Sequence, residues 1–311
     1  MQFALEGVNL VFESLYEFFF HRLKLRSLTY WTQYLLSRVI TSRQHPIVKE
    51  FRSLARGAGP LMLLDGWHLL GEAAAARVTV EKIAICGPPS AREKTVVDRL
   101  RRSGAQVVDV SGTVLNALSP VNSPTGVVAS ARIPSVVSAS VLSPAPALVL
   151  AAAGLQDPGN AGAIIRSAAA AGATGVVLDE LSADPWGWKA LRASMGTAFH
   201  LPVVRSRALA ALVSDWRSAG MRIVATVPRG GTPMYEVDFR QPSAVLLGGE
   251  GAGIPADLLD LADQEVTIPM QGAIESLNVA VAAAVLLYEA HRQRSSGGLK
   301  SSPTTVRRGE L

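Results

Sequence analysis

Short apolar runs alternate with helical stretches along the chain after about residue 40. In the first half these runs are LMLLDG, VEKIAIC, QVVDV and TGVVASA, and helical stretches such as WHLLGEAAAA and SAREKTVVDRLRRSG lie between them. Strands separated by helices of this size are typical of a small layered α/β domain. The pattern therefore predicts a first α/β domain over residues 41–132.

A second α/β pattern begins near residue 147, with apolar runs in LVLAAAGL, GVVL, RIVATV, AVLLGG and EVTIPM. These runs lack strict alternation, which indicates parallel strands covered on both faces. The last helical stretch, SLNVAVAAAVLLYEAHRQR, is apolar around nearly its whole circumference over three turns. We expect such a helix to be covered on two sides, by its own sheet and by another subunit. The prediction is a second α/β domain with a mainly parallel sheet over residues 147–294.

Three segments fall outside this pattern. Residues 133–146, in the uncharged stretch rich in Ser, Pro and Ala, have the composition of a linker, and residues 295–311 form a polar tail that we expect to be flexible. In residues 1–40, charged side chains break the apolar run well below the ~18–20 residues of a membrane span. This extension fits an amphipathic surface helix, or an appendage or misplaced start codon, and we assign it no function.

Composition and charge narrow the class of protein. With 49% hydrophobic and 18% charged residues the chain is globular rather than disordered. The formal net charge of +5 is compatible with a polyanionic partner without establishing one. The single cysteine, Cys86, excludes an intramolecular disulfide and a cysteine-based zinc site, and its apolar neighbours suggest a small core residue. We therefore expect a cytoplasmic protein with no metal site and no membrane association.

The stretch LQDPGNAGAIIRSAAAAG contains the first group of candidate functional residues. Its Asp-Pro-Gly sequence predicts a turn, with Asn160 placed to cap a helix that begins near Ala161. Arg166 is unusual because its neighbours along this helix are apolar. A permanently charged guanidinium at the rim of a site suits a phosphate or ribose oxygen. An ordinary helix cap and an exposed cation remain the alternative interpretation of the two residues.

The stretch VLLGGEGAGIP places Glu250 inside a glycine cluster that follows about the fourth strand of its domain. The glycine order differs from a dinucleotide fingerprint, and the Lys-Ser/Thr pair of a P-loop is missing. A carboxylate at this point would oppose a phosphate. Glycine permits close main-chain approach, so a ligand without phosphate and with a positive centre, such as S-adenosylmethionine, fits better. The alternative is that the glycines only turn the chain while Glu250 caps an amide.

The stretch VTIPMQGAIESLNVAVAAA adds two polar residues before the last helix. Ser276 stands where an N-cap would begin that helix. Asn278 is polar in an otherwise apolar first turn, and a buried amide is costly unless it is hydrogen-bonded. Asn278 is therefore expected to have a specific partner, either a neighbouring loop or a substrate.

Together, DPGNAGAIIRSA, LLGGEGAGIP and IPMQGAIESLNVAVAAAVLLYE resemble the three signature motifs of the SpoU/TrmH family of SPOUT RNA 2′-O-ribose methyltransferases. Their order and spacing also agree with the family over residues 147–294. More loosely, HPIVKEFRSL, LLDGWHLLGEA and SPTGVVA resemble the L30e-like substrate-binding domain found before the catalytic domain in many members.

The resemblance implies a trefoil-knotted catalytic domain, a homodimer formed through that domain, and S-adenosylmethionine as cofactor. It implies RNA as partner, with ribosomal RNA favoured over tRNA, whereas a catalytically silent RNA-binding member is the alternative. By motif position, the cofactor-binding residues are Thr226, Gly248, Gly249, Ile268, Met270 and Leu277. The catalytic residues carried over in the same way are Asn160, Arg166, Glu250, Ser276 and Asn278.

The role of Arg166 divides into two hypotheses. Family proposals make the motif arginine the base that takes the proton of the 2′-hydroxyl. Because a guanidinium is a very weak acid, we favour instead binding of the adjacent phosphate and stabilisation of the developing alkoxide, with the proton leaving to that phosphate or to water.

Overall fold

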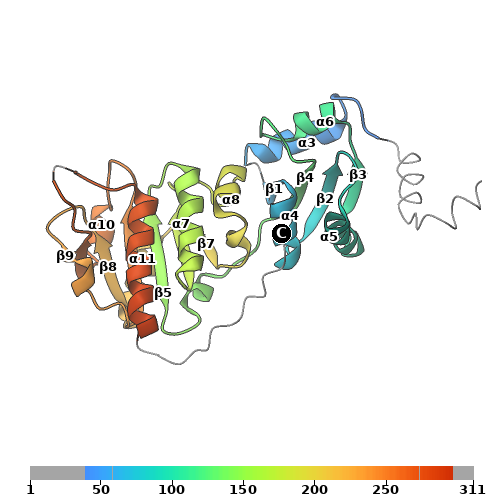
Figure 1. The fold of residues 1–311 in the computed structure, drawn as a ribbon. Coiled ribbons are helices and arrows are strands. Elements are labelled where there is room, and N and C mark those ends of the chain that lie inside the picture. Colours follow the sequence, from blue (N-terminus) through green and yellow to red (C-terminus); the bar gives the residue numbers. More distant parts are fainter. Residues whose placement is uncertain (1–38, 58, 273, 297–311) are drawn as a thin grey trace, which may run out of the picture.

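The computed structural model describes residues 39–57, 59–272 and 274–296 (Figure 1). Almost all of the predicted N-terminal extension and C-terminal tail lies outside these residues. The described chain forms two β-sheets, one of four strands and one of seven, each packed against helices. The α/β class predicted from the apolar runs is therefore confirmed.

The first sheet has the strand order β1-β4-β2-β3, in which β4 runs antiparallel to both neighbours. All four strands were predicted, and one helix, α6, was not. Leu63 of β1 faces α3 and α6 and packs in one cluster with Phe51 of α3. Leu64 of β1 points to the opposite face, toward α4 and α5, and packs in one cluster with Leu70 of α4. The elements are β1 Leu61–Asp65, β2 Val80–Ile85, β3 Gln106–Asp109, β4 Val127–Arg132, α3 Pro46–Ala55, α4 Trp67–Ala75, α5 Ala91–Arg102 and α6 Gly112–Leu118.

The second sheet is parallel throughout its pairings, with the order β7-β6-β5-β10-β8-β11-β9. Its strands are β5 Leu148–Ala153, β6 Gly175–Asp179, β7 Val203–Ser206, β8 Arg222–Thr226, β9 Thr232–Pro233, β10 Ser243–Gly248 and β11 Gln264–Thr267. Sequence patterning missed β7 and β9. The expectation that the glycine cluster follows about the fourth strand was consequently wrong, because β10 is the sixth strand of this sheet in chain order.

Helices cover both faces of the second sheet. Leu150 and Ala152 of β5 pack toward α7 and α11, whereas Val149 and Ala151 pack toward α9 and α10. The helices are α7 Pro158–Ala170, α8 Trp188–Ser194, α9 Leu209–Ser218, α10 Ala256–Leu259 and α11 Val279–Ser296, with short 3-10 turns at Ser138–Leu142, Thr197–Phe199 and Met234–Glu236. In the predicted linker, Val141 is fully buried and packs closely on Gly175. A Cβ added to Gly175 would lie 2.5 Å from the Val141 Cβ.

Helix α11 has one side against the protein and one side open. Ala283, Leu286 and Leu287 are buried, so the predicted cover by its own sheet is confirmed. Val281 and Tyr288 are about half exposed, at 49% and 51%. Cover of this side by a second subunit stays a prediction. Among the described residues, no helix combines the length and apolar character needed to cross a bilayer.

The two sheets meet where α8 packs against β1 and where the 3-10 turn at Thr197–Phe199 packs against α4 (Figure 1). The apolar cluster around Leu64 and Leu69 continues into Leu191 of α8. At the edge of this contact, His68 Nε2 lies 3.1 Å from the Met195 carbonyl oxygen, and His200 Nε2 lies 3.0 Å from Glu72 Oε2. The four-stranded sheet with its helices (the first unit) is therefore held against the seven-stranded sheet with its helices by both apolar packing and polar contacts.

Candidate functional site

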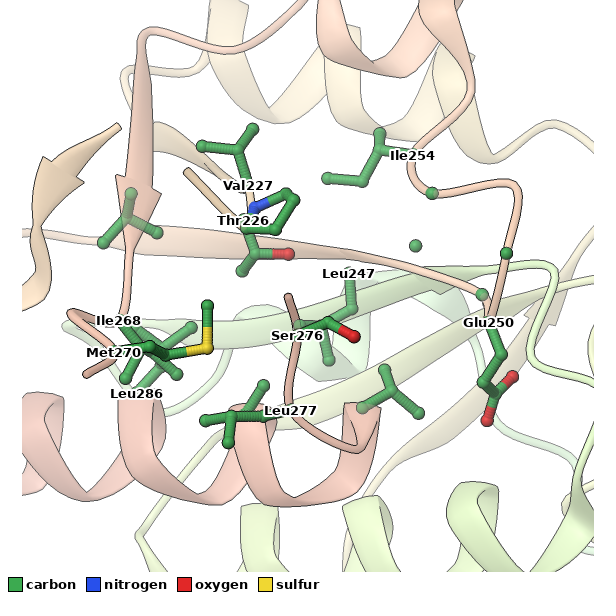
Figure 2. A pocket seen from close by; sticks show the side chains of 18 residues that line it. Thr226, Val227, Leu247, Glu250, Ile254, Ile268, Met270, Ser276, Leu277 and Leu286 are labelled. Atoms are coloured by element: carbon green, nitrogen blue, oxygen red, sulfur yellow. The ribbon is translucent and has the colours of Figure 1, made fainter. Parts of the chain in front are cut away.

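A pocket of about 390 Å³ opens where β8, β10 and β11 end (Figure 2). Because these strands are parallel, their carboxyl ends lie at one edge of the sheet, where ligands of open α/β sheets bind. Three loops form its walls: the one after β8, the one after β10 and the one between β11 and α11. All six residues predicted to contact a cofactor line it: Thr226, Gly248, Gly249, Ile268, Met270 and Leu277.

The end of β10 and the loop that follows it, residues 248–253 (the glycine loop), need glycine for steric reasons. A Cβ on Gly248 would lie 2.0 Å from the Gly253 carbonyl carbon, and a Cβ on Gly249 would lie 2.0 Å from the Gly154 oxygen. The Gly253 amide donates to the Gly249 oxygen at 3.2 Å, which closes the loop. The glycines thus turn the chain and bring bare backbone to the pocket wall.

The lining is apolar with a few polar groups and one charge. Thr226 and Ser276 contribute hydroxyl groups, and Glu250 is the charged side chain at the edge of the pocket. None of the described residues that line the pocket is Lys or Arg. A phosphate would therefore meet a carboxylate without a compensating cation. The wall suits a ligand with an apolar body and a neutral or positive centre.

Three of the predicted catalytic side chains form one hydrogen-bonded chain beside the pocket. Asn160 Nδ2 donates to Glu250 Oε1, and Asn278 Nδ2 donates to Asn160 Oδ1 at 3.1 Å. Asn278 Oδ1 in turn accepts from the amides of Ala280, at 2.9 Å, and Val281, at 3.3 Å. An ionised carboxylate only accepts, so Glu250 fixes the Asn160 amide, which then fixes Asn278.

Both helix caps differ from the prediction. Asp157, not Asn160, caps α7: its Oδ1 accepts from the Gly159 amide at 2.7 Å, and Pro158 takes the first helical position. Proline at that position carries its φ angle already set for a helix, so α7 begins before Asn160. The last helix is capped by Asn278 rather than Ser276. The expectation that Asn278 has a specific partner is confirmed, although its side chain is exposed rather than buried.

Arg166 lies apart from these residues. It is exposed on α7, about 120° around the helix and about 9 Å along its axis from Asn160. It does not line the pocket, and no described residue forms a hydrogen bond or ion pair with it. The chain thus brings together Asn160, Glu250, Ser276 and Asn278, and leaves Arg166 on the outer surface.

Sequence reasoning did not single out Val227, Leu247 and Ile254, which also line the pocket. Each lies close in sequence to a residue that was predicted, and the only sequence signal for these three is that they belong to apolar stretches. Among the described residues, no cluster of three or more His, Cys, Asp or Glu side chains is arranged to hold a metal ion. Cys86 is half-buried at the edge of the first unit's core.

Comparisons with known proteins agree on one family. The family model described as the SpoU rRNA Methylase family matches residues 147–288. An uncharacterized tRNA/rRNA methyltransferase of Synechocystis sp. is 37% identical over 82% of this chain and 94% of that protein. The 23S rRNA (guanosine(2553)-2′-O)-methyltransferase RlmP of Bacillus subtilis is 33% identical over 80% of this chain and 97% of that protein. The AdoMet-bound rRNA methyltransferase of Sinorhizobium meliloti superposes with a TM-score of 0.75 at 28% identity, covering 82% of this chain and 98% of that chain.

Proposed function

Because the chain belongs to the SpoU rRNA methylase family, we propose that it transfers the methyl group of S-adenosylmethionine to a ribose 2′-hydroxyl of ribosomal RNA. The observation that carries this proposal is the pocket at the ends of β8, β10 and β11, whose backbone-rich wall lacks cations. The preference for ribosomal RNA over tRNA is supported by the Bacillus subtilis relative, which is named a 23S rRNA methyltransferase.

The residues of the pocket fit S-adenosylmethionine. Its adenine and ribose carry no phosphate, and its sulfonium is positive, so a carboxylate at the pocket edge is favourable. Ile268, Met270 and Leu277 offer apolar contact for the adenine, and the Thr226 and Ser276 hydroxyls offer hydrogen bonds. The glycine loop and the loop before α11 are also where we place the trefoil knot implied by the family.

When bound, S-adenosylmethionine supplies an electrophilic methyl carbon on sulfur. The protein's task is to hold a ribose oxygen in line with that carbon and to exclude water. The Asn160–Glu250–Asn278 chain is fixed at the pocket edge and presents polar groups to an incoming nucleotide. Ser276 stands in the loop before α11, where its hydroxyl can contact either reactant.

We propose that Arg166 acts at the pocket of a second copy of the chain. We place the homodimer contact on the open side of α11, where Val281 and Tyr288 are exposed, so that Arg166 of one protomer reaches the pocket of the other. A guanidinium there would bind the phosphate beside the reacting ribose and stabilise the developing alkoxide. A guanidinium has N–H donors and no acceptor atom, so we assign the proton of the 2′-hydroxyl to the adjacent phosphate or to water rather than to Arg166.

The first unit, residues 41–132, is proposed as the substrate-binding part. It is joined to the catalytic sheet through α8, close enough for one RNA to contact both. Helix α5 carries Arg99, Arg101 and Arg102 near its end, and such a group suits an RNA backbone. The single cysteine is consistent with the reducing cytosol, where we place this reaction.

Methyl transfer from labelled S-adenosylmethionine to purified ribosomal RNA tests the proposal, with bulk tRNA as the comparison. We expect label in ribosomal RNA, followed by mapping of the modified ribose in RNA from cells with and without the gene. Cofactor binding without transfer to either RNA would instead favour the silent RNA-binding member. Absence of cofactor binding would overturn the proposal.

A further inference from the structure

Asp179 lies outside the pocket and outside the three motifs, at the end of β6, yet its carboxylate organises a neighbouring loop. Asp179 Oδ1 accepts hydrogen bonds from the Gly154 amide at 3.0 Å, the Ser182 amide at 2.9 Å and the Ser182 hydroxyl at 2.5 Å. Gly154 follows β5, so one of these bonds joins the loop after β6 to the loop after β5. The carboxylate makes charge-assisted bonds here, which are stronger than neutral ones.

Ser182 extends the contact to the next residue of the β5 loop. Its hydroxyl oxygen accepts from the Leu155 amide at 3.0 Å, and the Leu155 carbonyl accepts from the Ala183 amide at 2.6 Å. Both Ser182 and Leu155 are buried, at 4% and 0% exposure. Two consecutive residues of the β5 loop are thus tied to the β6 loop by bonds that water does not readily replace.

The opposite side of the β5 loop touches the pocket. The Gly154 carbonyl oxygen packs on Gly249 so closely that a Cβ there would lie 2.0 Å away. Three residues after Gly154, Asp157 caps α7, whose first turn holds Asn160. The β5 loop therefore lies between the Asp179 contacts on one side and the glycine loop on the other.

From this arrangement we propose that Asp179, acting through Ser182, is a positioning residue for methyl transfer. It holds Gly154 against Gly249, which sets the position of the glycine loop, and it holds the start of α7, which sets the reach of Asn160 to Glu250. The proposal rests on the proposed function for its effect on catalysis, whereas its effect on the two loops is independent of any activity.

Three variants separate this role from a general structural one. Asp179→Ala removes the acceptor. Asp179→Asn keeps an Oδ1 that can accept the same three bonds. Asp184→Ala is the matched control, because the carboxylate of this aspartate of the same loop accepts from the Trp186 amide at 3.1 Å and, among the described residues, makes no hydrogen bond to the β5 loop.

We expect Asp179→Ala to lower kcat by about 100-fold, as small misplacements of reacting groups do, and to weaken S-adenosylmethionine binding about tenfold. KM for RNA should stay near the wild-type value, because the hydrogen bonds of Asp179 all lie within the catalytic domain. Asp179→Asn should recover most of the rate, and Asp184→Ala should behave as wild type. Cofactor affinity is measured by calorimetry on protein whose folded fraction is known from circular dichroism.

Hydrogen–deuterium exchange adds a readout that needs no activity. In Asp179→Ala the amides of residues 154–155 and 249–253 should exchange faster, and in the control they should not. Unchanged exchange at 249–253 together with unchanged kcat would overturn the proposal, as would an Asp179→Asn variant as impaired as Asp179→Ala. If the wild-type chain transferred no methyl group, the proposed function would fail while the exchange result still decided whether Asp179 positions the loops.

Discussion

Replacing Gly248 with alanine should displace the wall of the pocket without changing any existing side chain in it. The new Cβ would lie 2.0 Å from the Gly253 carbonyl carbon and 2.3 Å from the Ile254 nitrogen, both backbone atoms. Ordinary contacts begin at 3.4 Å, so the glycine loop must retreat by about 1.4 Å. Displacement of about 1 Å at a reacting centre can cost about 100-fold in rate. Because Gly248 and Gly253 both line the pocket, the same movement should weaken cofactor binding.

Calorimetric titration with S-adenosylmethionine measures this effect, and thermal unfolding followed by circular dichroism measures the accompanying loss of stability. Gly71→Ala is the matched control, because this helical glycine has open space around its Cβ position and should bind the cofactor as wild type does. Gly248 has an ordinary negative φ angle, so backbone strain does not confuse the result. Wild-type affinity in a folded Gly248→Ala protein would show that the glycine loop does not form the cofactor wall.

Other substitutions test separate parts of the structure. Arg166→Ala should abolish methyl transfer while leaving cofactor affinity unchanged, and Arg166→Lys should retain part of the rate if charge alone is needed; single-turnover transfer to RNA measures both. Burial raises the pKa of Asp65 above its ordinary 3.8, despite the Ser119 hydrogen bond and the charge of Arg192, so the folded state is penalised as pH rises above that value. Asp65→Asn should therefore raise the melting temperature at pH 7 and lose that advantage below the ordinary pKa. Arg294 is half-buried with its pKa lowered by burial, and it donates to four backbone carbonyls, including that of Phe239 at 2.7 Å. Arg294→Met should cost about 2 kcal/mol of stability by urea unfolding, because those carbonyls lose their donor.

The apolar runs predicted most strands because parallel strands buried on both faces must be apolar at every position. Leu148–Ala153 is an example, with all six residues buried. The same logic failed for β7, which is four residues long at the edge of the sheet and contains Arg205 among its exposed positions. Helix α8, with seven residues, is too short for its periodicity to stand out. Strand β9, with two residues, likewise has too few positions for a pattern.

Helix caps were misplaced for a different reason. Asn160 and Ser276 are both good capping residues, and so are their neighbours Asp157 and Asn278. Local preference cannot choose between such candidates, because the start of each helix is also set by Pro158 and by the partners of the side chains. The Asn160 side-chain amide donates a hydrogen bond to Glu250, which lies 90 residues away in the chain. A bond over this sequence distance leaves no local sequence pattern.

Sequence spacing alone does not predict the hydrogen-bond partner of Glu250, the carboxylate in the glycine loop. Glycine order and charge indicate what ligand the loop disfavours, but the partner of Glu250 depends on which strands are neighbours. Strand β10 enters the sheet between β5 and β8, and Gly248 pairs in register with Ala153. The glycine loop and the loop leading to α7 therefore leave adjacent strands at the same level. That register lets Glu250 meet Asn160, and any sheet order that separated β5 from β10 would leave the carboxylate without this partner.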